Sequence, residues 1–127
     1  MSDFRTPLAR ILGLGSAKMG TEEFWLQRVT AVAMVFLTIY FVILVICLQG
    51  QPYEDVVSAL RHPINAVLMV CFVIAGVYHG KIGIQVVLED YAQNAATRVI
   101  LLLANNFFCA LVALGCIFAV LKIAFGG

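Results

Sequence analysis

The sequence predicts an all-α membrane protein with three transmembrane helices. Hydrophobic residues make up 63% of its 127 residues, charged residues only 12%, and the mean hydropathy is +1.02. Soluble domains average about 45–50% apolar residues, so a chain of this size could not bury the excess in a core of its own. Because a helix satisfies its own backbone hydrogen bonds in lipid, helices are the expected way for such a chain to cross a membrane.

Three apolar runs supply the spans, at about residues 26–48, 64–89 and 98–122. Each run is close to the roughly 20 residues that cross a hydrocarbon core of about 30 Å. The central parts of the first and third spans carry no charge, whereas His79 and Lys81 interrupt the second.

The chain is expected to be a single transmembrane anchor domain, residues 1–127, in which residues 1–24 form a cytoplasmic surface segment. This segment has a loosely amphipathic pattern and lacks the apolar core and cleavage site of a signal peptide. A transit peptide is the alternative, which Asp3 disfavours. Trp25, just before the first uncharged run, is expected to anchor the chain at the membrane interface.

The connections between the spans are short and polar. Gln49-Gly50-Gln51-Pro52 ends the first span, and residues 54–61 are typical of a short amphipathic helix on the membrane surface. Pro63 suits the first turn of the second helix. Residues 90–98 are expected to form a tight turn before the third span.

The distribution of Lys and Arg predicts the orientation of the chain. Only Arg61 and Lys122 lie on the side of the membrane that carries the C-terminus. The opposite side carries five basic residues: Arg5, Arg10, Lys18, Arg28 and Arg98. We therefore expect the N-terminus and the 90–98 turn on the cytoplasmic side of a bacterial inner membrane, with the mitochondrial inner membrane as the alternative.

His79 is the most informative residue. An ionisable side chain at bilayer depth is costly unless it has a partner, so it is a functional-site hypothesis by default. At about 100° per residue, Gly76 and Gly83 share its helix face, one turn before and one turn after it.

Two interpretations of this face stay open from the residues alone. The Gly76-x-x-x-Gly80 pattern lets helices pack closely, and His79 would then only bond a neighbouring helix. Alternatively, the missing side chains admit a flat macrocycle whose iron takes His79 as an axial ligand. His62, the other of the two histidines, sits at the far interface, so a haem with two histidine ligands would need the second from another subunit.

Asp90 and Tyr91 place a carboxylate and a phenol at the headgroup boundary. A tyrosine alone is common there as part of the aromatic belt. Together, the two groups could donate and shuttle protons to a quinone, which takes up two protons on reduction. His79 precedes Tyr91 by twelve residues, about 18 Å along a helix.

These residues carry a resemblance to a known family. The pattern His79-x-x-x-Gly83-x-x-x-Val87-Leu88-x-Asp90-Tyr91 resembles that of the small membrane-anchor subunits of succinate dehydrogenase (complex II), also called D subunits or cytochrome b small subunits. Arg28-Val29-Thr30-Ala31 is similar to the Arg-x-Thr-Ala of the same family, and the resemblance covers nearly the whole chain.

The resemblance implies half of a heterodimeric anchor bundle that binds haem b between its two subunits. His79 would be one axial ligand of the haem iron, and the larger cytochrome b anchor subunit would supply the other. Arg28 would hold a haem propionate or border the quinone pocket. Tyr91 would hydrogen-bond a quinone carbonyl, with Asp90 beside it in the proton path.

The resemblance also implies partner subunits and a reaction. A flavoprotein subunit and an iron–sulfur subunit would carry the FAD and the iron–sulfur clusters, for which this chain has neither a dinucleotide fingerprint nor a cysteine cluster. The complex would pass electrons from succinate to ubiquinone, without catalysis by this chain alone. A net charge of +1 gives no sign of nucleic-acid binding.

Lys81 departs from the family pattern, which often has an aromatic or apolar residue there. Asn105 and Asn106 enter the third span at a similar depth. Our hypothesis is that the Lys81 ammonium reaches one of these asparagines or snorkels toward the headgroups.

Three alternatives compete with the favoured function. The chain could be a haem-free structural anchor, in which His79 serves only packing, or the anchor of a fumarate reductase that uses menaquinone. A small transporter subunit is disfavoured because proton-coupled transport needs a carboxylate within the membrane, and the acidic residues here all lie at interfaces.

Overall fold

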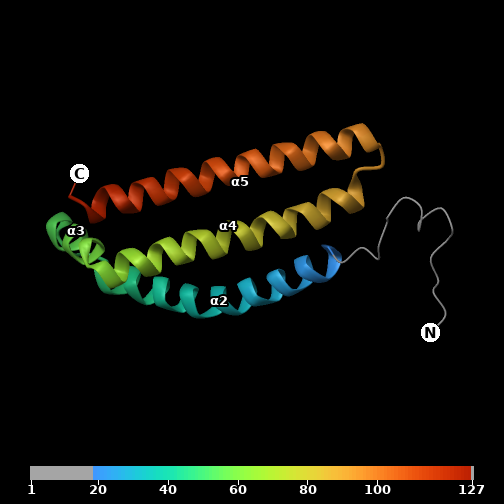
Figure 1. Ribbon diagram of the computed structural model, residues 1–127. Coiled ribbons are helices and arrows are strands. Elements are labelled where there is room, and N and C mark those ends of the chain that lie inside the picture. The colour runs from blue at the N-terminus through green and yellow to red at the C-terminus, as the bar shows by residue number, and fades with distance from the viewer. Residues whose placement is uncertain (1–18, 127) are drawn as a thin grey trace.

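Three long helices lie side by side in the protein (Figure 1). The computed structural model describes residues 19–126, which form α2 (Met19–Leu48), α3 (Tyr53–Arg61), α4 (Pro63–Tyr91) and α5 (Ala95–Ala124). No strand occurs within this range, and α2, α4 and α5 are long and apolar enough to cross a membrane. The predicted all-α class with three transmembrane helices is confirmed.

The long helices extend past the expected spans at both the start and the end of the chain. α2 begins at Met19, so residues 19–24 are helical, while the rest of the expected surface segment, residues 1–18, lies outside the described residues. α2 ends before Gly50, whose φ of +79° is the left-handed conformation that commonly follows a helix.

The connection between α4 and α5 is shorter than the predicted turn at 90–98. Residues 90 and 91 belong to the last turn of α4, and the connection consists of residues 92–94. The Asn94 side chain accepts a hydrogen bond from the Ala96 N–H at 3.0 Å and caps α5. The Arg98 guanidinium donates to the Ala92 carbonyl at 3.2 Å. With these two contacts, a connection of only three residues is enough to join α4 to α5.

α3 forms where an amphipathic surface helix was expected. It starts directly after Pro52, with Glu54 and Asp55 in its first turn and Arg61 in its last, as the helix dipole favours. Pro63 occupies the first turn of α4, as predicted. α3 packs against α4 and α5 at the end of the bundle where the chain ends (Figure 1).

α4 is the central helix, since it packs against both α2 and α5. Few side chains are buried in this row of helices: among the described residues only Ile82, Ala92, Asn105 and Cys109 are. Most large apolar side chains of α2 and α5 are exposed. Lipid or other subunits must therefore cover most of this surface in the membrane.

The polar contact between α4 and α5 differs from the one predicted for Lys81. The Asn105 side-chain amide donates to the backbone carbonyl of Lys81 at 3.1 Å and accepts from the Cys109 thiol at 3.5 Å. The Lys81 ammonium lies 6.0 Å from the centre of the Tyr78 ring instead. The predicted contact between the Lys81 ammonium and an asparagine was therefore wrong, and the alternative, that the ammonium snorkels toward the headgroups, stays a prediction. A carbonyl oxygen within a helix has a second lone pair, and at Lys81 this lone pair accepts the hydrogen bond from the buried Asn105 amide.

A polar clamp joins three helices at the end of the bundle where α4 begins. The Tyr40 hydroxyl of α2 donates to the Asn65 side-chain oxygen of α4 at 2.6 Å. The Asn65 amide donates in turn to the Ala59 carbonyl near the end of α3 at 2.7 Å. One asparagine thus fixes α3 and α2 to the start of α4.

Breaking this clamp is expected to destabilise the protein. Asn65→Leu leaves a phenol and a carbonyl without their partner, at a cost of about 1–3 kcal/mol, whereas Tyr40→Phe removes one hydrogen bond worth about 0.5–1.5 kcal/mol. The melting temperature of the detergent-solubilised complex measures both effects. Melting temperatures equal to that of the unmodified protein would contradict the structural role of the clamp.

Candidate functional site

His79 lies near the middle of α4, half-buried against α2. Its Nδ1 atom is 3.1 Å from the Thr30 hydroxyl oxygen. That hydroxyl also lies 2.7 Å from the Leu26 carbonyl and 3.1 Å from the Gln27 carbonyl. Among residues 19–126, the imidazole therefore has one polar partner, which is supplied by the neighbouring transmembrane helix.

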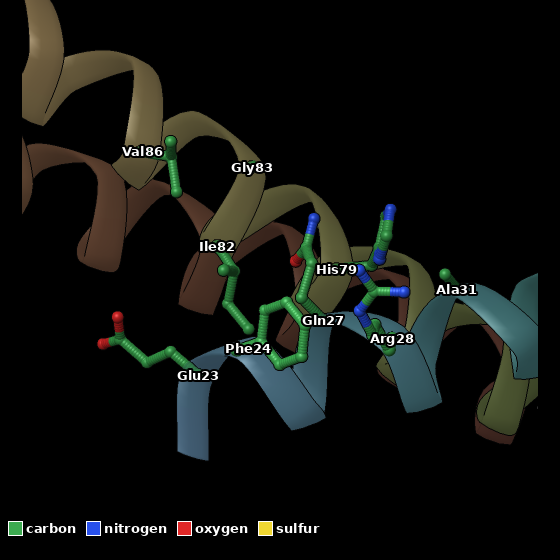
Figure 2. A pocket seen from close by; sticks show the side chains of 9 residues that line it. All are labelled: Glu23, Phe24, Gln27, Arg28, Ala31, His79, Ile82, Gly83 and Val86. Carbon is green, nitrogen blue, oxygen red and sulfur yellow. The ribbon is translucent and has the colours of Figure 1, made fainter. Parts of the chain in front are cut away.

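A hollow of about 530 Å³ opens beside the imidazole, between α2 and α4 (Figure 2). Most of its wall is apolar, and its polar groups come from both helices. The residues that line it are Glu23, Phe24, Gln27, Arg28, Ala31, His79, Ile82, Gly83 and Val86. The structure thus brings three predicted site residues together: Arg28, His79 and Gly83.

A second hollow, of about 350 Å³, also reaches His79. Five residues of α2 complete its wall: Ala31, Met34, Val35, Thr38 and Ile39. His79 and Ala31 line both hollows, so there is free space on two sides of the imidazole along the α2–α4 surface. A flat, mostly apolar group that binds a histidine nitrogen fits this arrangement.

The two glycines predicted to flank the cofactor differ in their surroundings. Gly83 borders the first hollow, where an added Cβ would lie 3.9 Å from the Gln27 side-chain nitrogen. At Gly76 an added Cβ would lie 3.5 Å from both Sδ and Cε of Met34. Gly76 therefore serves the packing of α4 on α2, and it lines neither hollow beside His79.

Polar groups at the N-terminal end of α2 border the first hollow. The Arg28 guanidinium carbon lies 4.4 Å from the centre of the Phe24 ring, a distance at which the cation and the ring attract each other. The Gln85 amide of α4 donates to Glu23 at 3.3 Å. The side-chain oxygen of Gln27 is buried without a hydrogen-bond partner among residues 19–126. The Arg28 cation can bind a polar group at the edge of a ligand.

Asp90 and Tyr91 stand apart from this hollow. Both are exposed in the last turn of α4, with Tyr91 82% exposed, and neither lines a hollow beside His79. They lie at the end of the bundle where α2 begins (Figure 1). Within the described residues, the structure therefore does not join the predicted quinone residues and the predicted cofactor residues into one pocket.

Sequence reasoning left several site residues without a role. Thr30 was noted only as part of the Arg-x-Thr-Ala pattern, and Glu23 and Gln27 were not singled out. A signal for them exists, because Glu23, Gln27, Thr30 and Met34 recur at spacings of three and four residues and so share one face of α2.

This fold and site define a class of protein: a multi-pass helical membrane protein with a histidine placed between surface hollows at mid-span. The chain belongs to the succinate dehydrogenase/fumarate reductase transmembrane subunit family, whose family model matches residues 2–121. The match confirms the family to which the residue pattern pointed.

Individual relatives agree with this assignment. A succinate dehydrogenase hydrophobic membrane anchor subunit of Rickettsia bellii is 31% identical over 118 residues, which cover 93% of this chain and 94% of the relative. A protein of the same name from Paracoccus denitrificans is 31% identical over 121 residues, covering 95% of this chain and 93% of the relative. One from Rickettsia conorii is 27% identical over 108 residues, or 84% and 86% of the two chains.

Proposed function

We propose that this chain anchors a succinate dehydrogenase in a bacterial inner membrane, shares haem b with a larger second anchor subunit, and borders the site that reduces ubiquinone. The observation that carries the haem proposal is His79: a half-buried imidazole at mid-span, bonded to Thr30 through Nδ1 and bordered by hollows on two sides. Family membership supports the anchor role.

The residues around His79 suit haem b. His79 would bind the iron, and the Arg28 cation would neutralise a propionate at the membrane surface. Gly83 and Ala31 leave space beside the imidazole, while Phe24 and Ile82 keep the wall of the hollow apolar. When bound, haem b supplies one-electron oxidation and reduction.

The second axial ligand must come from another subunit if the haem has two histidine ligands. His62 precedes α4, seventeen residues before His79, which is about 25 Å along a helix. Both hollows beside His79 lie on the surface of this chain rather than between three of its helices. A second anchor subunit packed on this surface would close them and supply the missing ligand.

Tyr91 and Asp90 suit a quinone site that a partner completes. The Tyr91 phenol can donate a hydrogen bond to a quinone carbonyl, and the neighbouring carboxylate of Asp90 can relay protons. The high exposure of Tyr91 leaves it free to contact another subunit. The flavoprotein and iron–sulfur subunits would dock at this end, on the cytoplasmic side, and deliver electrons from succinate.

A reduced-minus-oxidised optical spectrum of the purified complex, together with its subunit composition, tests this proposal. A b-type band with a flavoprotein, an iron–sulfur protein and a second anchor subunit is the expected result. The same companions without a haem band would leave the anchor role and refute the haem assignment. The absence of the companions would refute the anchor role itself.

The chain expressed without its partners is expected not to retain haem b. Half of the ligand set is missing, and the hollows beside His79 remain open to lipid or detergent. Haem retained per chain after purification, measured as the pyridine haemochrome, should be near zero, whereas coexpression with the second anchor subunit should restore it. A purified single chain with six-coordinate haem would contradict the shared site.

A further inference from the structure

The Thr30 hydroxyl makes three polar contacts, but it has one hydrogen and can donate it fully to only one of them. Its oxygen lies 2.7 Å from the Leu26 carbonyl, 3.1 Å from the Gln27 carbonyl and 3.1 Å from His79 Nδ1. Carbonyl oxygens carry no hydrogen, so the short contact with Leu26 requires the Thr30 hydroxyl to donate to it. This is the bond that threonine often makes to the residue four positions earlier in a helix.

The contact between the Thr30 hydroxyl and His79 Nδ1 then fixes the tautomer of the imidazole. With the Thr30 hydrogen directed at Leu26, the hydroxyl oxygen can only accept from His79. The hydrogen of the imidazole therefore resides on Nδ1, and Nε2 keeps its lone pair. The opposite tautomer would place two lone pairs against each other at 3.1 Å.

We infer that Thr30 is the positioning residue of the haem site: by accepting the Nδ1 hydrogen of His79, it fixes the tautomer and the ring rotation that present Nε2 to the iron. This inference rests on the proposed function. A histidine that binds a metal usually donates its second ring hydrogen to a neighbouring acceptor, which orients the ring and raises its basicity. Here the acceptor belongs to α2, so the packing of α2 on α4 controls the ligand.

The structure also explains why the acceptor is well held. Thr30 is half-buried, and its β-branched side chain has few rotamers. The bond to the Leu26 carbonyl restrains the hydroxyl further. A rigid acceptor of this kind allows the imidazole little rotation.

Thr30→Val, in the complete complex, tests the inference because valine keeps the shape of threonine and removes the acceptor. Haem retention against a haem-scavenging apoprotein should weaken by about 10- to 100-fold. The haem midpoint potential should rise, since a less basic imidazole stabilises ferric iron less. The highest g value of the ferric haem in electron paramagnetic resonance should shift as well. Thr30→Ala should give the same changes if the valine variant assembles poorly.

Thr30→Ser is the matched control, since it keeps the hydroxyl and should keep the potential and the g values of the unmodified complex. Thr21→Val removes an exposed hydroxyl from the first turns of α2 and should change nothing. Unchanged potential and g values in Thr30→Val would overturn the inference, as would equal shifts in the serine and valine variants. If Thr30→Val changes neither value in a complex that contains haem, the inference fails and the proposed function stands. An unmodified complex without haem refutes the inference and the haem assignment, but it leaves the anchor role.

Discussion

Replacing His79 with alanine is expected to remove the low-spin b-type haem band from the purified complex. The substitution deletes the proposed axial ligand, and with it the hydrogen bond to Thr30 across the α2–α4 interface. Loss of a direct ligand should lower haem retention by more than the roughly 10- to 100-fold that changes in outer hydrogen bonds cost. Reduced-minus-oxidised spectra, scaled to the flavin content of the same sample, measure the loss.

The control for this experiment is His62→Ala. His62 is the second of the two histidines, and it is exposed where α3 meets α4. Its replacement should leave the haem band unchanged. An unchanged spectrum in His79→Ala would rule out the ligand role and leave His79 a packing residue, as the haem-free anchor hypothesis requires.

Much of the fold was predictable because the bilayer constrains it so strongly. A hydrocarbon core fixes the length of each apolar run, and the helix is the conformation that satisfies the backbone there. The position of His79 inside a span was also predictable, since it interrupts one of these runs, while its role as a ligand stays a prediction. These predictions depend on composition along the chain and need no knowledge of how the helices pack.

The contacts between helices that sequence reasoning missed depend on the register between those helices. The bond between Thr30 and His79 joins residues 49 positions apart, and nothing in the periodicity of either helix fixes their relative height. The same limit explains Lys81, whose backbone carbonyl, rather than its ammonium, meets Asn105. It explains Gly76 as well: periodicity places it near His79 on α4, but only packing shows that Met34 fills the space above it.

Replacing Tyr91 with phenylalanine is expected to impair ubiquinone reduction while leaving succinate oxidation with a soluble dye intact. The substitution removes one hydroxyl and keeps the ring, so the end of α4 should be unaffected. A lost hydrogen bond to a quinone carbonyl is worth about 1–2 kcal/mol, which corresponds to a roughly tenfold slower quinone reduction. The ratio of the two activities, measured on the same membranes, isolates the quinone step from the amount of assembled complex.

Tyr53 supplies the matched control for Tyr91. Both tyrosines are 82% exposed, but Tyr53 starts α3, at the opposite end of the bundle (Figure 1). If exposure alone mattered, the two phenylalanine variants would have the same activities. A difference between them must therefore come from the side of the membrane on which each hydroxyl lies. Tyr53→Phe should keep both activities. Equal losses in both assays for Tyr91→Phe would indicate failed assembly, and unchanged activities would show that the Tyr91 hydroxyl does not contact the quinone.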